Sequence, residues 1–195
     1  SKKIGNKCLP RKKKKIYKNI VLRNVKSYDD LPSDIAIRIE RGVGGRRTFR
    51  YVDQSICTDI RNDNDENKPW GYVTIAKPSD YENGCGDVYI ARIIESDNKW
   101  GPLLLKLAIE WASKNCDGLI ADRFRVTEFE YHLWNYLLGN LGGDLITKPI
   151  APCVNKSSKV WAERLSIEED DAATSFTFSS ESNMMKDLLK SKRIC

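Results

Sequence analysis

The chain has 195 residues and a mass of 22.3 kDa, which is the size of one domain with short extensions. Its mean hydropathy of −0.52, and the lack of any run near the roughly 20 apolar residues of a membrane helix, predict that it makes no membrane contact. The net charge of +6 is unevenly spread. Residues 1–28 hold eleven Lys or Arg and no acid, which leaves 22 basic and 27 acidic residues for the rest.

The first 15 residues are predicted to form a basic arm, because they are polar and contain Gly5 and Pro10, which interrupt regular structure. Such arms commonly bind nucleic acid or an acidic protein surface, and neutralising phosphates releases counterions whatever the base sequence. A solvated tail without a specific contact is an equally good interpretation. No apolar segment follows the arm, so we expect no secretory signal peptide.

The cysteines do not form a metal-binding or disulfide-framework pattern. No two of them have CxxC spacing, and His132, the single histidine, has no Cys neighbour at zinc-ligand spacing. We therefore expect no metal site, and reduced thiols in an intracellular protein. The six residues concerned are Cys8, Cys57, Cys85, Cys116, Cys153 and Cys195.

The N-terminal part of the body is predicted to alternate strands and turns. Residues 16–25 have β-branched residues around a hydrophobic centre and are predicted to be the first strand. A turn over 28–34 leads into a predicted short helix over 35–41, with Ser33 or Asp34 as N-cap. The cationic run GVGGRR over 42–47 lacks the Gly-Lys-Ser/Thr ending of a phosphate-binding loop, so a nucleotide site is not expected there.

Three further strands are predicted before the centre of the chain. They cover residues 47–53, 70–77 and 88–94, the last two forming a hairpin with a long loop. The polar segment 61–68 is predicted to be an exposed loop. It is not a calcium loop, because Lys68 stands where that loop needs Gly.

Helices and strands are predicted to alternate in the second half. A helix over 102–114 starts with Pro at its first position and carries an apolar stripe. After a strand over 118–123, a second helix begins at Thr127, with Glu130 as its capping-box partner, and ends before Gly139.

The remaining predicted elements are two strands and a tail. Residues 145–150 and 160–167 are predicted to complete the sheet, and residues 168–195 to form a second tail that ends in a short amphipathic segment.

This order of elements over residues 16–167 resembles that of the GNAT acyltransferase superfamily. The resemblance implies an α+β fold of three layers, with a mixed, mostly antiparallel sheet and flanking helices. It implies that the fourth strand, 88–94, diverges from the fifth, 118–123. Acyl-coenzyme A would lie in the resulting slot, with its pantetheine bonded to the fourth strand.

The family's pyrophosphate loop, Arg/Gln-x-x-Gly-x-Gly/Ala, corresponds here to residues 97–102. Only Gly101 matches a family glycine, the leading Arg or Gln is missing, and Pro102 lacks an N–H donor. Lys99 can supply a compensating charge. The residues that the resemblance assigns to acetyl- or acyl-coenzyme A are Ile93, Ile94, Asn98, Lys99, Trp100, Gly101 and Leu103.

Two residues are candidates for acid–base catalysis. Glu95 ends the fourth strand, where it could deprotonate an amine directly or through water. The family often uses a Tyr as the acid that protonates the leaving thiolate, and Tyr136 is the candidate, with Tyr131 as a second choice. Trp134 stands where this Tyr most often lies, and each candidate has a purely structural interpretation.

The residues after the fifth strand have two interpretations. Asp122 and Arg123 lie at its carboxyl end, where sites gather in α/β folds, but our default is an ion pair that holds the following loop. His132 lies among aromatic residues of a helix, which favours a packed or surface position.

Two functions from different classes remain. The segments WGPLLLKLAIEWA, GLIADR and LWNYL also look like those of GNAT-like proteins encoded by bacteriophages. With the degraded loop, this favours a non-enzymatic structural or binding component of a larger assembly, such as a phage virion. The alternative is an acyl-coenzyme A-dependent N-acyltransferase acting on an amine of a protein or small molecule.

The expected partners and location follow from the first function. Both tails would contact other protein subunits, and Lys2–Lys18 is a candidate contact with nucleic acid. The protein would lie in the host cytoplasm or in the virion.

Overall fold

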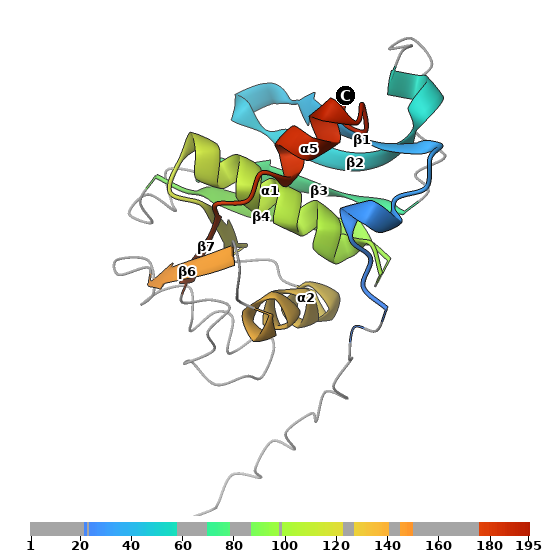
Figure 1. Cartoon of the computed structure of the whole chain (residues 1–195). Helices are drawn as coiled ribbons and strands as arrows, with labels where there is room; N and C mark the ends of the chain where they lie inside the picture. The colour runs from blue at the N-terminus through green and yellow to red at the C-terminus, as the bar shows by residue number, and fades with distance from the viewer. Residues whose placement is uncertain are drawn as a thin grey trace, which may run out of the picture.

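A single mixed sheet organises the part of the chain that the structure describes (Figure 1). In this sheet the strand order is β1-β2-β3-β4-β5-β7-β6, which agrees with the predicted α+β class. None of the described helices is long and apolar enough to cross a bilayer. The computed structural model describes residues 22, 24–57, 70–78, 87–97, 99–122, 127–140, 145–149 and 176–195.

The first four strands form an antiparallel meander. The predicted strands over 47–53, 70–77 and 88–94, and the hairpin between the last two, are confirmed. Short 3₁₀ turns at Tyr28–Asp30, Val43–Gly45 and Gln54–Cys57 flank β1 and β2. The bounds of the strands are β1 Ile35–Arg41, β2 Arg47–Asp53, β3 Gly71–Ala76 and β4 Tyr89–Ser96.

The helix predicted over 35–41 is wrong, because these residues form β1. Its isoleucines at 35, 37 and 39 recur every second residue and all pack against the core, which is the period of a strand and not of a helix. β-Branched side chains also suit the pleated sheet. Pairing with β2 along all seven residues then outweighs the helix-cap pattern at Ser33 and Asp34.

The structure describes only three residues of the strand predicted over 16–25, and none of the three lies in a strand. These residues are Leu22, Asn24 and Val25. Asn24 has a φ of 55°, a left-handed conformation that interrupts an extended chain. The rest of that segment, the arm over 1–15, the loop over 61–68 and the strand predicted over 160–167 lie outside the described residues.

The second half of the sheet is built around a crossover helix. β4 pairs with β5, Leu119–Ala121, in parallel, and α1, Gly101–Asn115, connects them. β5 continues antiparallel to β7, Phe176–Ser180, and β7 to β6, Leu145–Pro149. The predicted elements over 102–114, 118–123 and 145–150 are thus confirmed, with small differences at their ends.

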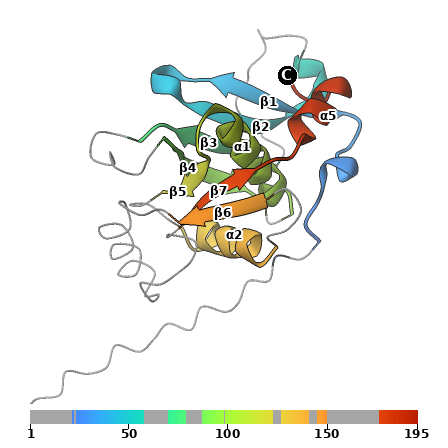
Figure 2. The same cartoon turned by 60° about the vertical axis from the view of Figure 1, so that its left-hand side comes forward.

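The second predicted helix is also confirmed, including its start. α2 covers Glu128–Gly139, and the Thr127 side chain and Glu130 form the expected capping box. The Thr127 N–H donates to the Glu130 carboxylate over 2.7 Å, and the Glu130 N–H donates to Thr127 Oγ1 over 3.1 Å. In Figures 1 and 2, α2 lies at the β6 end of the molecule, away from β1.

Residues 176–195 are not a tail, which corrects the interpretation of the last segment. They form β7 inside the sheet and α5, Met184–Lys190, which packs against α1. Phe178 and Leu188 are buried in the core. The short polar stretches around these two residues hid their periodicity, so the sequence pattern alone did not place them.

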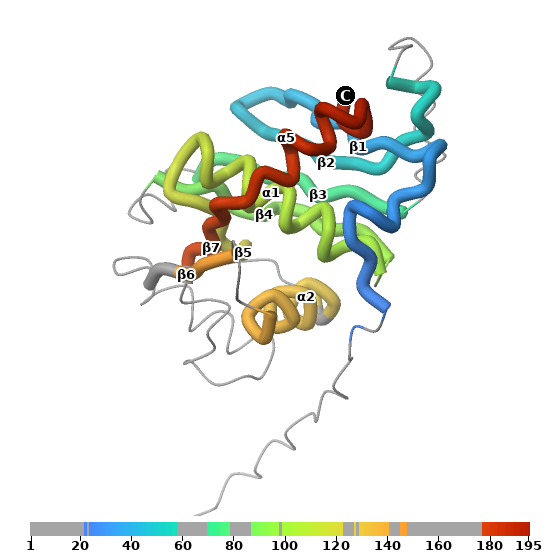
Figure 3. The backbone as a smooth tube through the Cα atoms, viewed as in Figure 1, coloured from blue at the N-terminus to red at the C-terminus, as the bar shows by residue number. Residues whose placement is uncertain are grey.

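The C-terminal segment then runs to the free edge of β1, as the tube in Figure 3 shows. The N–H groups of Ile37 and Ile39 donate to the carbonyls of Arg193 and Cys195 over 2.8 and 2.9 Å. The Arg193 guanidinium in turn donates to the carbonyls of Leu31, Pro32 and Ile35. The last residues therefore cover an edge strand that would otherwise expose unpaired backbone groups.

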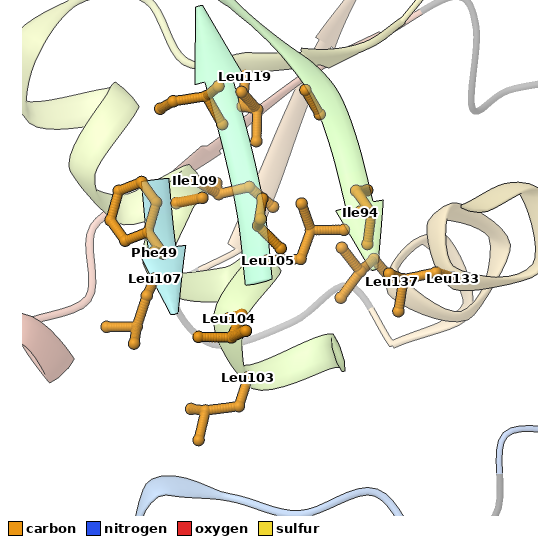
Figure 4. Close-up of a cluster of buried hydrophobic side chains, with 14 of the residues drawn as sticks. Phe49, Ile94, Leu103, Leu104, Leu105, Leu107, Ile109, Leu119, Leu133 and Leu137 are labelled. Atoms are coloured by element: carbon orange, nitrogen blue, oxygen red, sulfur yellow. The ribbon is translucent and has the colours of Figure 1, made fainter. Parts of the chain in front are cut away.

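The core lies between α1 and the sheet. Leu104, Leu105, Leu107 and Ile109 of α1 are fully buried, and Figure 4 shows them beside Phe49, Leu119 and the leucines of α2. Burying side chains of this size stabilises the fold by roughly 1.5–3 kcal/mol each. The position of α1 is therefore strongly determined.

Cys57 and Cys195 form a disulfide, so the expectation of reduced thiols is wrong for this pair. Cys116 is free and half-buried. Its thiol donates to the carbonyl of Ala112 over 3.0 Å, and burial raises its pKa. The disulfide joins the end of the chain to the segment after β2, a pairing that the sequence spacing could not identify.

We predict that the variant C57S/C195S loses about 2–5 kcal/mol of unfolding free energy, because the bond closes a loop with a sequence separation of 138 residues. Urea unfolding without reductant measures the difference. C116S, which leaves the disulfide intact, is the control. Unfolding of wild-type protein in dithiothreitol should match the double variant, and identical curves with and without reductant would contradict the prediction.

Candidate functional site

The candidate site lies where β4 and β5 part. The two strands pair over only three residues, Tyr89–Ala91 of β4 with Leu119–Ala121 of β5, whereas β4 continues to Ser96. A register shift between β3 and β4 at Thr74/Ile75 places an extra β4 residue, Arg92, at this point. Such a bulge bends and twists its strand. The last part of β4 therefore runs on without β5 beside it.

A carboxylate of α2 occupies the gap between these strands. The Glu130 side chain is buried, with 5 % of the residue exposed, and the backbone N–H of Ile94 donates a hydrogen bond to it. Burial raises the pKa of Glu130, and the nearby negative charge of Asp122 adds to this effect. The hydrogen bonds from Thr127 and Ile94 act in the opposite direction, but burial dominates.

An ion pair spans the gap beside Glu130. Arg92 Nη1 lies 3.3 Å from Asp122 Oδ2, and the Asp122 side chain is only 7 % exposed. Asp122 therefore pairs with Arg92, a partner that the sequence pattern did not indicate. The predicted pair of Asp122 with Arg123 stays a prediction, because Arg123 lies outside the described residues. The gap thus holds two carboxylates with different environments.

The loop before α1 uses its own backbone donors. The Asp97 carboxylate accepts from the N–H groups of Lys99 and Trp100 over 2.9 and 2.8 Å. The Gly101 N–H donates to the Asp97 carbonyl over 3.1 Å, and Pro102 has no N–H. Asp97 therefore engages the N–H groups of Lys99, Trp100 and Gly101, which an anion at this helix start would otherwise use.

Trp100 belongs to an aromatic cluster and not to a ligand surface. Its ring stacks on Trp70 with centroids 4.6 Å apart, and Tyr51 meets both rings edge-on. The Tyr51 hydroxyl donates to the Trp100 carbonyl over 2.9 Å. Burial raises the Tyr51 pKa well above its usual range, and the Asp97 charge raises it further, so the hydroxyl keeps its proton.

Gly101 has a steric role. A Cβ at this position would lie 2.3 Å from Ser96 Oγ and 3.4 Å from Phe129. A side chain at this position would have to displace the Ser96 hydroxyl, so the close approach of β4 to the start of α1 favours glycine here whether or not a ligand binds.

The predicted site residues are dispersed. Ile93 is 41 % exposed. Glu95 is also exposed, and it lies opposite Tyr72 of β3 on the face of the sheet away from α1. Ile94 is buried in the core, as is Leu103. Lys99 is exposed and accepts from the Lys26 N–H through its carbonyl, and Asn98 lies outside the described residues.

The structure brings together Leu103 and Tyr136, which line one cavity on the outer side of α1. Glu95 is not among the residues that line it, so the proposed base and acid do not meet there. His132 is buried and contacts Tyr131, as expected of a packed residue.

Sequence reasoning assigned Glu130 only to the capping box and did not single out Arg92. The signal for Glu130 was present: it shares a helical face with Leu133, Trp134 and Leu137, all of them fully buried. An acid on an apolar helix face points to a buried carboxyl. The position of Arg92 beside Asp122 results from the bulge in β4, and no residue pattern in the sequence predicts that bulge.

No metal centre is found among the described residues, where no three His, Cys, Asp or Glu side chains gather in a way that could hold an ion.

Comparison with known proteins identifies no relative of this chain. No family model matches the chain, no curated protein matches it, and no solved structure matches it. The function must therefore be argued from the residues themselves.

We predict that Glu130→Gln alters how stability depends on pH. Because the folded state raises the Glu130 pKa, wild-type stability falls as pH rises above about 4.5, the ordinary Glu value, until the folded-state pKa is passed. The variant should lose this decrease and be at least as stable as wild type at pH 8. Urea unfolding of both proteins between pH 4 and pH 8 measures the pH dependence of the unfolding free energy.

Glu95→Gln, which removes an exposed carboxyl from the neighbouring strand, is the control and should leave the profile unchanged. A Glu130→Gln profile parallel to that of wild type would show that Glu130 is ionised in the gap without penalty.

Proposed function

We propose that this chain is a binding component of a larger assembly, built on a GNAT-like scaffold that no longer binds acyl-coenzyme A. The observation that carries the proposal is that the chain's own carboxylates engage backbone N–H groups that the resemblance assigns to the cofactor. Asp97 accepts from the loop N–H groups, and Glu130 accepts from the Ile94 N–H of β4.

The strand order and the parting of β4 from β5 support a scaffold of this kind. The resemblance implies a mixed, mostly antiparallel sheet whose fourth strand diverges from the fifth, with a helix between them in the chain. The arrangement of β4, α1 and β5 agrees with each of these features.

Charge supports the loss of cofactor binding. A pyrophosphate is stabilised at a helix start by free N–H groups and positive charge. At this loop it would meet the Asp97 carboxylate instead, with two of its donors already engaged. A pyrophosphate that displaced Asp97 would have to break its hydrogen bonds to these N–H groups, and one that bound beside it would be repelled by its like charge.

The disulfide supports a location outside a reducing cytoplasm. Disulfides persist in oxidising environments, which include virion and cell surfaces. The Cys57–Cys195 bond therefore favours a phage particle over the host cytoplasm as the place where this chain works.

One observation favours the alternative of an acyl-coenzyme A-dependent N-acyltransferase. Glu130 is a buried carboxyl with a raised pKa in the gap between β4 and β5, which is suited to accepting a proton from an amine. An active enzyme would then use Glu130 in place of Glu95, and Asp97 would have to leave its loop.

Titration calorimetry with acetyl-coenzyme A separates the two functions. We expect no saturable binding to the oxidised wild-type protein up to millimolar coenzyme. Micromolar binding that Lys99→Glu weakens at least tenfold would overturn the proposal and support the acyltransferase. Lys99 is exposed on the loop, so this change tests the loop without the clash that a side chain at Gly101 would cause.

The contact with neighbours is assigned to the basic arm. Residues 176–195 pack into the fold. Of the predicted C-terminal tail, only residues 168–175 are therefore proposed to contact other subunits. Residues 1–15 contain eight Lys or Arg, enough for a strongly salt-dependent contact with nucleic acid.

We predict that the chain binds a 20-base-pair DNA duplex with an affinity that falls steeply with salt, and that deleting residues 1–15 abolishes this binding at 100 mM salt. Fluorescence anisotropy with a labelled duplex measures the salt dependence of the wild-type affinity and the affinity of the deletion variant. The control is K186Q/K190Q, which removes a comparable type of charge from exposed positions of α5. Equal affinity of the deletion variant and wild type would exclude the arm as the contact.

A further inference from the structure

A cavity of about 590 Å³ lies over the outer side of α1. Its walls are the segment 25–28, the first turns of α1, the end of α2, and the C-terminal segment between β7 and α5. In Figure 3 the segment 25–28 lies near the start of α1, α2 lies on one side of the helix, and the C-terminal segment crosses on the other side. The volume is within the range of small-molecule sites in proteins.

Apolar side chains provide one part of the lining. Leu103 of α1 and Leu145 of β6 are buried, and Met184 of α5 is partly buried beside them. Three hydrophobic side chains from three elements can cover a hydrocarbon chain, and Met adapts its shape to such a ligand.

The charged residues of the lining are unbalanced. Lys26 pairs with Asp30 over 3.6 Å, and Asp187 pairs with Lys190 over 3.9 Å. Lys106 also lines the cavity and is half-buried, and within the described part of the chain no carboxylate lies within ion-pair distance of its ammonium. Among the described residues, Lys106 is therefore a lining cation without an ion-pair partner, and Asp187 is a lining carboxylate that already pairs with Lys190.

The acid that could neutralise Lys106 from the next helical turn is engaged elsewhere. Glu110 is fully buried and pairs with Lys114. It also accepts from the Ser182 hydroxyl over 2.5 Å and from the Met185 N–H over 3.2 Å. A helical i, i+4 pair would otherwise be the expected partner of this lysine.

A hydroxyl lies among the lining residues with Lys106. Tyr136 of α2 lines the same cavity, and among the described residues no hydrogen bond engages its hydroxyl. An ammonium and a phenol are suitable donors for a carboxylate or phosphate group.

We propose that this cavity binds a small organic anion with an apolar chain. Its carboxylate or phosphate head lies on Lys106 and Tyr136, and its chain lies against Leu103, Leu145 and Met184. The cavity does not include Glu130 or Arg92 of the gap between β4 and β5, but it shares Leu103 and Tyr136 with the residues that the resemblance assigns to the acyltransferase.

The test is a titration of the full-length oxidised protein with octanoate, octyl phosphate, 1-octanol and octylammonium, followed by amide chemical shifts. We expect saturable shifts around the cavity with one or both anions, and binding at least tenfold weaker for the alcohol and the amine. Comparison of the two anions identifies the preferred head group.

Three variants locate the site. Lys106→Met should weaken anion binding at least tenfold, Lys106→Arg should retain it, and Lys186→Met, at an exposed position of α5, should leave it unchanged. Asn183→Trp fills the cavity from an exposed position that makes no side-chain cap hydrogen bond, and should abolish binding while keeping Lys106.

Two results would overturn the proposal. One is the absence of saturable shifts with both anions at 10 mM. The other is anion affinity that neither Lys106→Met nor Asn183→Trp changes in a variant whose spectrum shows it to be folded.

Discussion

The packing of α1 across the sheet is the constraint on which the rest of the described structure depends. Two parallel strands can be joined only by a crossover, and here that crossover buries nearly one whole face. Once α1 is fixed, its first residue must lie against Ser96 of β4, and its buried Glu110 must find partners. The start of the C-terminal segment provides them through Ser182 and Met185. The helix thus holds the sheet, the loop before it and the end of the chain together.

The backbone donors that diverging strands and a helix start would present are taken by carboxylates of the same chain. Asp97 closes the loop, and Glu130 closes the gap beside Ile94. A carboxylate in such a place satisfies N–H groups that would otherwise be buried without a partner. It also removes the positive potential that makes a helix start attractive to phosphate. The same arrangement therefore stabilises the fold, and it is the basis of our proposal that the chain does not bind the cofactor that the resemblance implies.

Local periodicity was sufficient for most elements and misleading for a few. The apolar stripe of α1 and the capping box of Thr127 and Glu130 are short-range signals, and both were read correctly. Residues 35–41 carry a cap-like start as well as alternating isoleucines, and pairing with β2 decided between them. β7 is five residues long and polar at every second position, so its place between β5 and β6 could be seen only after the sheet had formed.

The sequence by itself determined the class of the fold, the position of the central helices, and the departure of residues 97–102 from a phosphate-binding loop. These depend on side-chain type and spacing within a few residues of one another. Only the tertiary structure decided that Asp97 closes this loop, that Glu130 enters the gap, that Arg92 pairs with Asp122, and that Cys57 meets Cys195. Each of these depends on where a strand bends or where distant segments come together, and no local pattern encodes that geometry.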